Sequence, residues 1–173
     1  MGEIPALAAH LAPNTIRQLE RAASERFEEA ERLRKQNRLL AAIYLYGYCV
    51  EMCLAAACFR RAGFAPNRVI DEDVRRRRMA QARQLVHQDG SPLMSSEPHP
   101  LDGWARYLQW HRCRAGTPAP AEEKRLAEAV HKAKLVYKHW RPELRYKTTG
   151  VSPGQLDEVQ RCVRWFLEQV GRL

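Results

Sequence analysis

The sequence predicts an all-α protein, built as an up-and-down bundle of four long helices plus one short helix. First, residues 37–63 are apolar on nearly every side, and between residues 39 and 59 the only charge is Glu51. Second, other segments repeat apolar residues at three- and four-residue steps, which is typical of amphipathic helices. Third, the sequence lacks alternating apolar and polar runs of strand length. We expect one helical domain over residues 14–173, preceded by a loosely ordered arm over residues 1–13.

Residues 37–63 are interpreted as the central helix of the core. Asn37 can cap its first turn, and Gly63 can end it in a left-handed conformation. The run is also long enough to span a membrane, but a carboxylate near its centre opposes insertion into lipid. In a core, a buried carboxylate needs a cationic partner or a proton. We therefore expect a cation elsewhere in the chain to pair with Glu51.

Capping residues and prolines mark the starts of the other helices. A capping box of Thr15 and Gln18 opens a helix that ends near Gln36. Because almost no loop separates this helix from the central one, the two should pack antiparallel. The remaining expected starts are acids at 71–73 for a segment reaching about residue 88, Asp102 for the short helix, Pro120, and Ser152 with Pro153 and Gln155. Residues 89–100 and 115–120 are predicted loops.

The charge balance is strongly basic and dominated by arginine. The net charge is +9, and arginine supplies 23 of the 29 basic residues. Guanidinium groups bind phosphate in a bidentate fork, so the balance favours a polyanionic partner such as RNA. An alternative is an arginine-rich surface that only keeps the protein soluble.

Four successive arginines, Arg75, Arg76, Arg77 and Arg78, are the candidate RNA-binding residues. On a helix they point in nearly all directions, so two or three at most can face one partner. The alternative is that these arginines form a solvated face and pair with the acids that precede them.

The cysteines indicate reduced thiols. There are five, an odd number without a CxxC pair, and the chain begins without a secretion signal, so we expect a cytoplasmic location. Cys49 and Cys53 share a helix face but lack a second cysteine or histidine pair, so we interpret them as small core residues rather than metal ligands. No metal and no cofactor is expected.

Two segments together resemble the HEPN family of helical-bundle domains. The first is AIYLYGYCVEMCLAAA at residues 42–57, which resembles the second helix of that family. The second is WRPELRY at residues 140–146, which resembles the segment that carries an arginine before the last helix. The positions that correspond to the family's motif residues are Tyr44, Gly47, Tyr48, Glu51, Leu54, Ala55, Ala56, Arg145 and Tyr146. The resemblance covers roughly residues 15–170.

The resemblance implies a cytoplasmic bundle that forms homodimers. Many members of the family are metal-independent endoribonucleases of toxin–antitoxin, CRISPR and other defence systems, whereas others bind RNA or nucleotide without cutting, or accompany a minimal nucleotidyltransferase. In the cutting members a histidine follows an arginine after four to six residues. The histidine can move the proton of the ribose 2′-hydroxyl, and the arginine can stabilise charge on the phosphate.

This sequence departs from the catalytic pattern. The positions after Arg145 that should hold histidine are Gly150, Val151 and Ser152, and Ala55 stands where the family has lysine. The spacing recurs from Arg106 to His111 and from Arg125 to His131, as often as chance would give. These pairs lie outside the segment in which the family's motif belongs.

Three functions follow from these observations. The favoured one is an RNA-associated protein of a defence or toxin–antitoxin system that binds RNA rather than cutting it. The alternatives are a non-catalytic dimerising module for a partner protein such as a nucleotidyltransferase-like antitoxin, and a metal-independent endoribonuclease. The endoribonuclease would use Arg145 with a base such as His111, His131 or His139.

Arg145 is also the candidate partner of Glu51. A pair between them, with Tyr146 beside it, would either fix the bundle or form part of a site, and we favour the structural role. Of the three tyrosines at 44, 46 and 48, Tyr44 is expected in the core.

Overall fold

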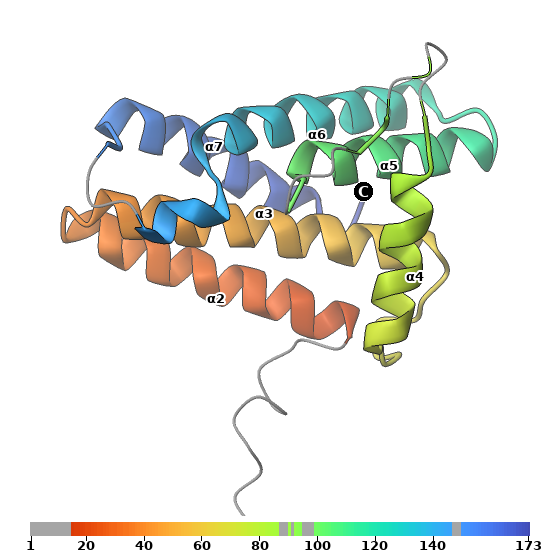
Figure 1. The fold of residues 1–173 in the computed structure, drawn as a ribbon, viewed down its shortest axis with the longest axis horizontal. Helices are drawn as coiled ribbons and strands as arrows, with labels where there is room; N and C mark the ends of the chain where they lie inside the picture. Colours follow the sequence, from red (N-terminus) through yellow and green to blue (C-terminus); the bar gives the residue numbers. More distant parts are fainter. Residues whose placement is uncertain (1–14, 87–89, 91, 95–98, 147–149) are drawn as a thin grey trace, which may run out of the picture.

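The computed structural model describes residues 15–86, 90, 92–94, 99–146 and 150–173, with the side chain of Arg145 excepted. Over these residues it is all-helical, so the predicted all-α class is confirmed (Figure 1). The expected N-terminal arm lies outside the described residues. The elements are α2 (Ile16–Lys35), α3 (Leu39–Arg61), α4 (Glu72–Arg83), α5 (Leu101–Arg114), α6 (Pro120–His139), the 3₁₀ helix η1 (Pro142–Tyr146) and α7 (Pro153–Gln169).

Helix α3 runs through the middle of the molecule. Figure 1 shows α2 antiparallel beside it, α5, α6 and α7 on its other side, and α4 crossing one end of the bundle. α3 contacts α2, α5, α6, α7 and η1. By length and composition alone α3 could cross a membrane, but half of the residues in its most apolar window are buried inside the protein. Its side chains are therefore arranged as those of a central packing helix.

Local chemistry sets most helix starts as the sequence predicts. The Thr15 hydroxyl accepts a hydrogen bond from the Gln18 backbone N–H at 3.1 Å, which caps α2. The Asp71 carboxylate does the same for Val74 at 2.7 Å and caps α4. At α7, Ser152 and Gln155 form a complete capping box. These side chains satisfy backbone donors that a helix start leaves unpaired.

Two predicted caps are wrong. Asn37 has a φ of +59°, so it adopts a left-handed conformation just after α2 instead of capping α3, whose N-cap residue is Arg38. An asparagine tolerates this conformation because its short polar side chain can bond locally. Asp102 lies inside the first turn of α5 rather than before it, and it accepts a hydrogen bond from Arg106 at 2.6 Å. Gly63, with a φ of +79°, follows α3 as predicted.

Two short helices are present where the bundle is predicted to hold one. Helix α4 has 12 residues and α5 has 14. The segment expected to remain helical to about residue 88 ends at Arg83, because the chain then turns and pairs with a later stretch. The Leu93 N–H donates to the Leu85 carbonyl at 2.9 Å, and Val86 forms an isolated bridge with Pro92.

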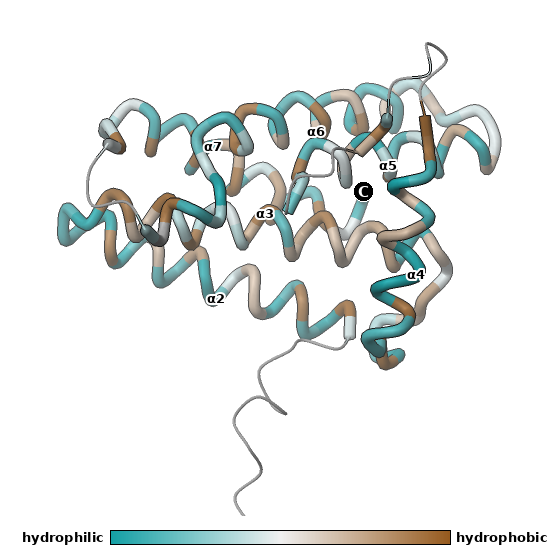
Figure 2. Tube along the Cα trace, viewed as in Figure 1, coloured by the Kyte–Doolittle hydropathy of each residue, from teal (hydrophilic) through white to brown (hydrophobic). Residues whose placement is uncertain are grey.

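Tyr46 and Trp140 are among the largest fully buried side chains. Tyr46 donates a hydrogen bond to the Glu31 carboxylate, and its ring lies 5.7 Å from that of Phe27. Tyr44, expected in the core, is only half-buried, and its hydroxyl meets that of Tyr48 at 3.2 Å. Figure 2 shows the contrast between an apolar to neutral α3 and a largely hydrophilic α4.

Trp140 packs directly against the backbone of α3 at Gly47. A Cβ atom at Gly47 would lie 2.2 Å from atoms of the indole ring, so no other residue fits there without a shift of the ring. The indole N–H donates to the Tyr44 carbonyl at 3.0 Å. The two segments that carry the family resemblance therefore meet in space at this contact.

Candidate nucleic-acid interface

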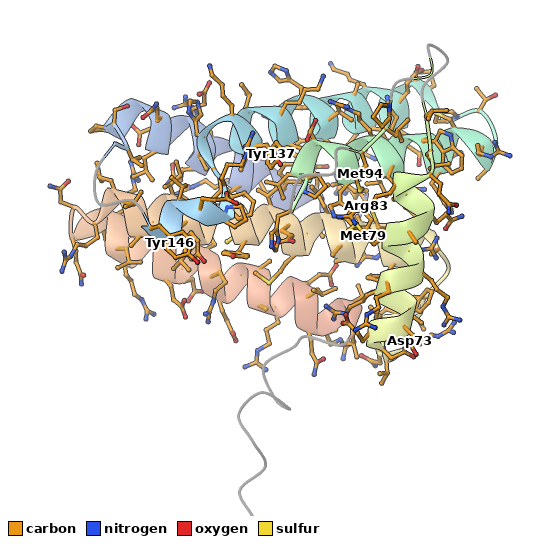
Figure 3. All side chains as sticks on the ribbon, in the orientation of Figure 1. Asp73, Met79, Arg83, Met94, Tyr137 and Tyr146 are labelled. Carbon is orange, nitrogen blue, oxygen red and sulfur yellow. The ribbon has the colours of Figure 1, made fainter. Side chains whose placement is uncertain are left out.

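The arginine run lies on α4, the helix that crosses the end of the bundle. Acids occupy the first turn of α4, where they complement the helix dipole. Figure 3 shows Asp73 at this end of the helix. Arg76 lies 3.3 Å from Glu72, and both side chains are largely exposed. Exposed pairs of this kind contribute little to stability. The alternative of a solvated, acid-paired face therefore holds for Arg76.

The other arginines of the run reach two separate hollows. Successive helical residues are rotated by about 100°, so neighbours cannot point the same way. Arg75 and Arg78 line a cavity between α3, α4 and α5, whereas Arg77 and Arg78 line a more open hollow beside Phe64. Two arginines of the run line each hollow, which is within the expected limit of two or three facing one way. Arg78 lines both hollows and is their common element.

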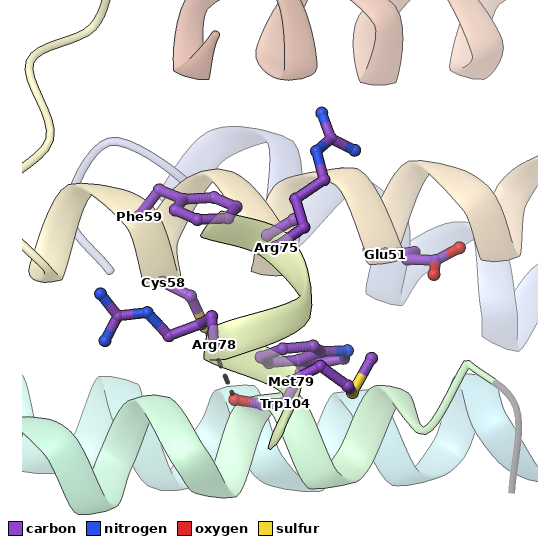
Figure 4. Close-up of a pocket in the computed structure, with 8 residues that line it drawn as sticks. Glu51, Cys58, Phe59, Arg75, Arg78, Met79 and Trp104 are labelled. Atoms are coloured by element: carbon purple, nitrogen blue, oxygen red, sulfur yellow. Dashed lines mark hydrogen bonds between the residues drawn. The ribbon is translucent and has the colours of Figure 1, made fainter. Parts of the chain in front are cut away.

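We call the first hollow the ring cavity. Its volume is about 160 Å³. Its lining residues are Glu51, Ala55, Cys58 and Phe59 of α3, Arg75, Arg78 and Met79 of α4, and Trp104 of α5 (Figure 4). The lining is mainly apolar, and its charges come from one carboxylate and two guanidinium groups. Such a hollow accepts an apolar body that also has polar groups at its edge.

The thiol of Cys58 is not a nucleophile in this cavity. Burial raises the pKa of Cys58 to about 12. Its sulfur donates a weak hydrogen bond to the Trp104 carbonyl at 4.0 Å, drawn in Figure 4. The thiolate is the reactive form of cysteine, so Cys58 contributes packing rather than chemistry here.

Glu51 is paired, but with a residue that the sequence did not single out. Its Oε1 lies 2.5 Å from Nδ1 of His99, and about a quarter of its side chain is exposed. Glu51 therefore lies at the edge of the core rather than inside it. The side chain of Arg145 lies outside the described part of the structure, so the pair of Glu51 with Arg145 stays a prediction. Tyr146 is 73% exposed on η1 (Figure 3).

We call the second hollow the arginine hollow. It has a volume of about 270 Å³ and is lined by Phe64, Arg68, Val74, Arg77, Arg78 and Gln81. The Arg68 guanidinium lies over the Phe64 ring at 4.2 Å. Arg78 donates to the Tyr107 hydroxyl at 3.0 Å and to Gln81 Oε1 at 3.4 Å. Phe64, Arg68 and Trp104 were missed by sequence reasoning, because as single residues outside any motif they give no pattern.

The charge of the arginine hollow is not neutralised within the part of the chain that the structure describes. No carboxylate lies within salt-bridge distance of Arg68, Arg77 or Arg78 there. By contrast, Arg61 and Arg112 share the carboxylate of Glu122 at 2.6 and 2.8 Å. Three guanidinium groups without an acidic partner favour an anion in the hollow.

Arg106 and His111, the first spacing match, have different surroundings on α5. Arg106 is bound by Asp102, and His111 lies near the other end of α5, with its ring 6.1 Å from that of Tyr107. Burial lowers the pKa of His111, and the charges of Arg78 and Arg61 lower it further.

The second arginine–histidine match is separated as well. Arg125 donates to the Arg172 carbonyl at 3.4 Å, while His131 is exposed on α6. The remaining candidate base, His139, bonds to Glu158 at 2.8 Å and links α6 to α7. Neither spacing match therefore forms an arginine–histidine pair. Among the described residues, no group of three histidine, cysteine or acidic side chains is arranged to hold a metal ion.

Comparison of the chain with protein-family models, with curated proteins and with solved structures gives no match. The fold and the arginine hollow define the chain as a helical bundle with a cationic surface beside an aromatic ring at one end.

Proposed function

We propose that this chain is an RNA-associated protein that binds single-stranded RNA through the α4 end of its bundle. The observation that carries the proposal is the arginine hollow, where Arg68, Arg77 and Arg78 gather without an acidic partner among the described residues. Guanidinium forks match phosphate oxygens, and each phosphate contact releases counterions. Aromatic rings beside the cations suit single strands, because unstacked bases can lie against them.

Binding rather than cutting is the function we infer for this surface. This inference is supported by the two arginines of the arginine–histidine spacing matches. Arg106 and Arg125 are each hydrogen-bonded to a group other than the histidine of the match. A cleaving site needs a proton acceptor within hydrogen-bond reach of the ribose hydroxyl and a cation at the phosphate.

The same proposal includes membership of the HEPN family. It also includes an up-and-down bundle, a homodimer, a cognate partner protein, a cytoplasmic location and a role in defence or toxin–antitoxin systems. It rests on the motifs at residues 42–57 and 140–146. The contact of Trp140 with Gly47, which joins these two segments, supports it.

The experiment is binding of a labelled single-stranded RNA of about 12 nucleotides, in chelator, as a function of salt. The test variant is Arg68→Gln with Arg77→Gln, and the matched control is Lys124→Gln with Lys134→Gln. All four side chains are exposed, so both variants lose two charges at the surface. We expect the test variant to bind at least about tenfold more weakly and to lose about 1.4 from the salt slope, while the control stays close to the wild type.

Equal losses in the two variants would show that net charge alone attracts RNA and would contradict an RNA site at α4. No binding by the wild type would contradict the proposal as a whole and would direct attention to a protein partner. The same samples, run on a denaturing gel, should show intact RNA. Cleavage by the wild type would replace binding with an endoribonuclease activity.

A further inference from the structure

We propose that the RNA strand continues from the arginine hollow onto α5, where one of its bases stacks on the guanidinium group of Arg114. This inference rests on the proposed RNA binding, because the phosphates of the same strand would lie in the arginine hollow. It adds a contact that requires a base to a surface that would otherwise recognise only charge.

Arg114 is an exposed cation that lies over an aromatic ring. Its guanidinium carbon is 5.0 Å from the centre of the Trp110 ring, and the residue belongs to the last turn of α5. Arg112 in the same turn is bound by Glu122 at 2.8 Å, whereas no carboxylate of the described residues lies within salt-bridge distance of Arg114. The attraction between the cation and the indole therefore positions Arg114 without neutralising its charge.

A row of side chains on α5 leads to this pair. Tyr107, Trp110 and Arg114 follow one another at three- and four-residue steps, so they lie on the same side of the helix. The rings of Tyr107 and Trp110 are 6.2 Å apart and nearly parallel, with an angle of 18° between their planes. Tyr107 is only 1% exposed and Trp110 is half-buried. The row therefore runs from the core outward to Arg114.

The same row is connected to the arginine hollow. Arg78 lines this hollow and donates a hydrogen bond to the Tyr107 hydroxyl at 3.0 Å. Figure 4 shows the guanidinium of Arg78 directed away from Trp104, the aromatic residue one turn before Tyr107. Burial, and then the positive charges of Arg78 and Arg61, lower the pKa of His111. The charge of Arg78 is therefore felt in the turn of α5 that carries Trp110.

The two places suit different parts of one strand. In the arginine hollow, Arg68 lies over the Phe64 ring at 4.2 Å, but two further arginines line the same hollow, which favours phosphate there. Arg114 lies outside that lining and over an indole, the strongest aromatic partner of a cation. A guanidinium plane is a surface on which an unstacked base can lie. A stack of base, guanidinium and indole is therefore the contact we infer for Arg114.

The test compares the binding of two labelled strands of equal length and charge to the full chain: a single-stranded RNA of about 12 nucleotides and an abasic strand. We expect the wild type to bind the RNA about tenfold more tightly than the abasic strand. Equal affinity for the two strands would overturn the base contact while leaving phosphate binding intact. No binding of either strand would overturn this inference together with the proposed RNA binding.

Arg114→Lys locates the base. Lysine keeps the positive charge but has no planar group, so this variant should lose most of the tenfold advantage of RNA over the abasic strand, with an unchanged salt slope. Arg164→Lys is the matched control, because Arg164 of α7 lies over the Phe27 ring of α2 at 5.6 Å. The control should keep the advantage. Retention of the advantage in Arg114→Lys, or an equal loss in the control, would overturn the assignment to Arg114.

Two variants of Trp110 test the ring beneath the guanidinium. Trp110→Leu removes the aromatic surface, whereas Trp110→Phe keeps an aromatic ring at this place. We expect the leucine variant to lose the advantage of RNA over the abasic strand and the phenylalanine variant to keep most of it. A melting curve of each protein shows whether the fold is retained. An equal advantage in the two folded variants would overturn the role of Trp110 in the stack.

Discussion

One face of α3 lies near a tryptophan at two places, and the packing at the two places differs. Gly47, Glu51 and Ala55 follow one another at four-residue steps, so they lie along the same side of the helix. At Gly47 the ring of Trp140 lies so close that a single added carbon would overlap it. At Ala55, two turns further on, Trp104 shares the lining of a cavity of about 160 Å³. We call the close contact at Gly47 the sealed end of this face and the cavity at Ala55 its hollow end. Glu51 lies between them.

The difference shows that identical chemistry can serve structure or binding, depending on the fit. Both places combine a small residue of α3 with an indole ring. The sealed contact is closed by the hydrogen bond from the Trp140 indole to the Tyr44 carbonyl. The lining of the cavity at Ala55 includes two arginines. Interiors are otherwise packed as densely as organic crystals, so a cavity of this size marks a candidate site.

The sealed end should be the most sensitive part of the molecule. Gly47→Ala places a methyl group inside the Trp140 ring contact, and overpacking of this kind should destabilise the protein by about 3 kcal/mol. Thermal unfolding would measure it. Gly154→Ala is the control, since a Cβ there meets no other atom within 4 Å, and its melting temperature should stay close to that of the wild type. A Gly47→Ala protein as stable as this control would show that the contact is not close.

Tyr46, next to Gly47, should give the second largest effect. Burial and the bond to Glu31 raise the pKa of Tyr46, so the hydroxyl stays protonated and donates to Glu31. Tyr46→Phe removes this donor and should cost about 1–2 kcal/mol. Chemical denaturation of the two proteins at neutral pH would measure the difference. No loss of stability would mean that the bond has no net value.

The same bond makes stability depend on pH. Burial raises the pKa of Glu31, but hydrogen bonds from Tyr46 and Gln160 and nearby arginines outweigh it, and the net pKa lies below the usual 4.5. A lowered folded-state pKa contributes stability that is complete above the unfolded value and is lost as pH falls through the folded value. The melting temperature should therefore fall below about pH 4.5, and less steeply in Glu31→Gln. An equally steep fall of the melting temperature in the wild type and in Glu31→Gln would show that Glu31 does not cause the pH dependence.

The hollow end should respond in the opposite direction to added volume. Ala55→Leu fills space that the fold leaves open, and filling a cavity commonly stabilises a protein by about 1 kcal/mol. The comparison with Gly47→Ala is direct, because both changes add carbon atoms to the same side of α3. A strong destabilisation by Ala55→Leu would show that the two ends are packed alike.

The pair between the two ends should have the smallest effect. Glu51 and His99 are both partly exposed, and pairs in contact with solvent contribute less than about 1 kcal/mol. His99→Gln should therefore change the free energy of unfolding only slightly. A loss of several kcal/mol would show that the pair belongs to the sealed end.

The candidate site could be predicted only in part. The arginine run was found because four charges in a row are visible in any sequence, and helical geometry limits how many can face one way. The partners of these arginines were missed. Phe64 and Arg68 come from the connection between α3 and α4, Trp104 comes from α5, and His99, which contacts Glu51, belongs to no motif. The pair of Glu51 with Arg145 stays a prediction.

By itself, the sequence determined the helical class and most helix ends, because these depend on interactions within about four residues. Thr15, Gly63, Pro120 and Ser152 act on their own turns wherever the helices finally lie. Only the tertiary structure decided what those helices bring together. The Glu51–His99 pair and the Trp140–Gly47 contact join residues that are 48 and 93 positions apart, and their geometry depends on how every intervening helix packs.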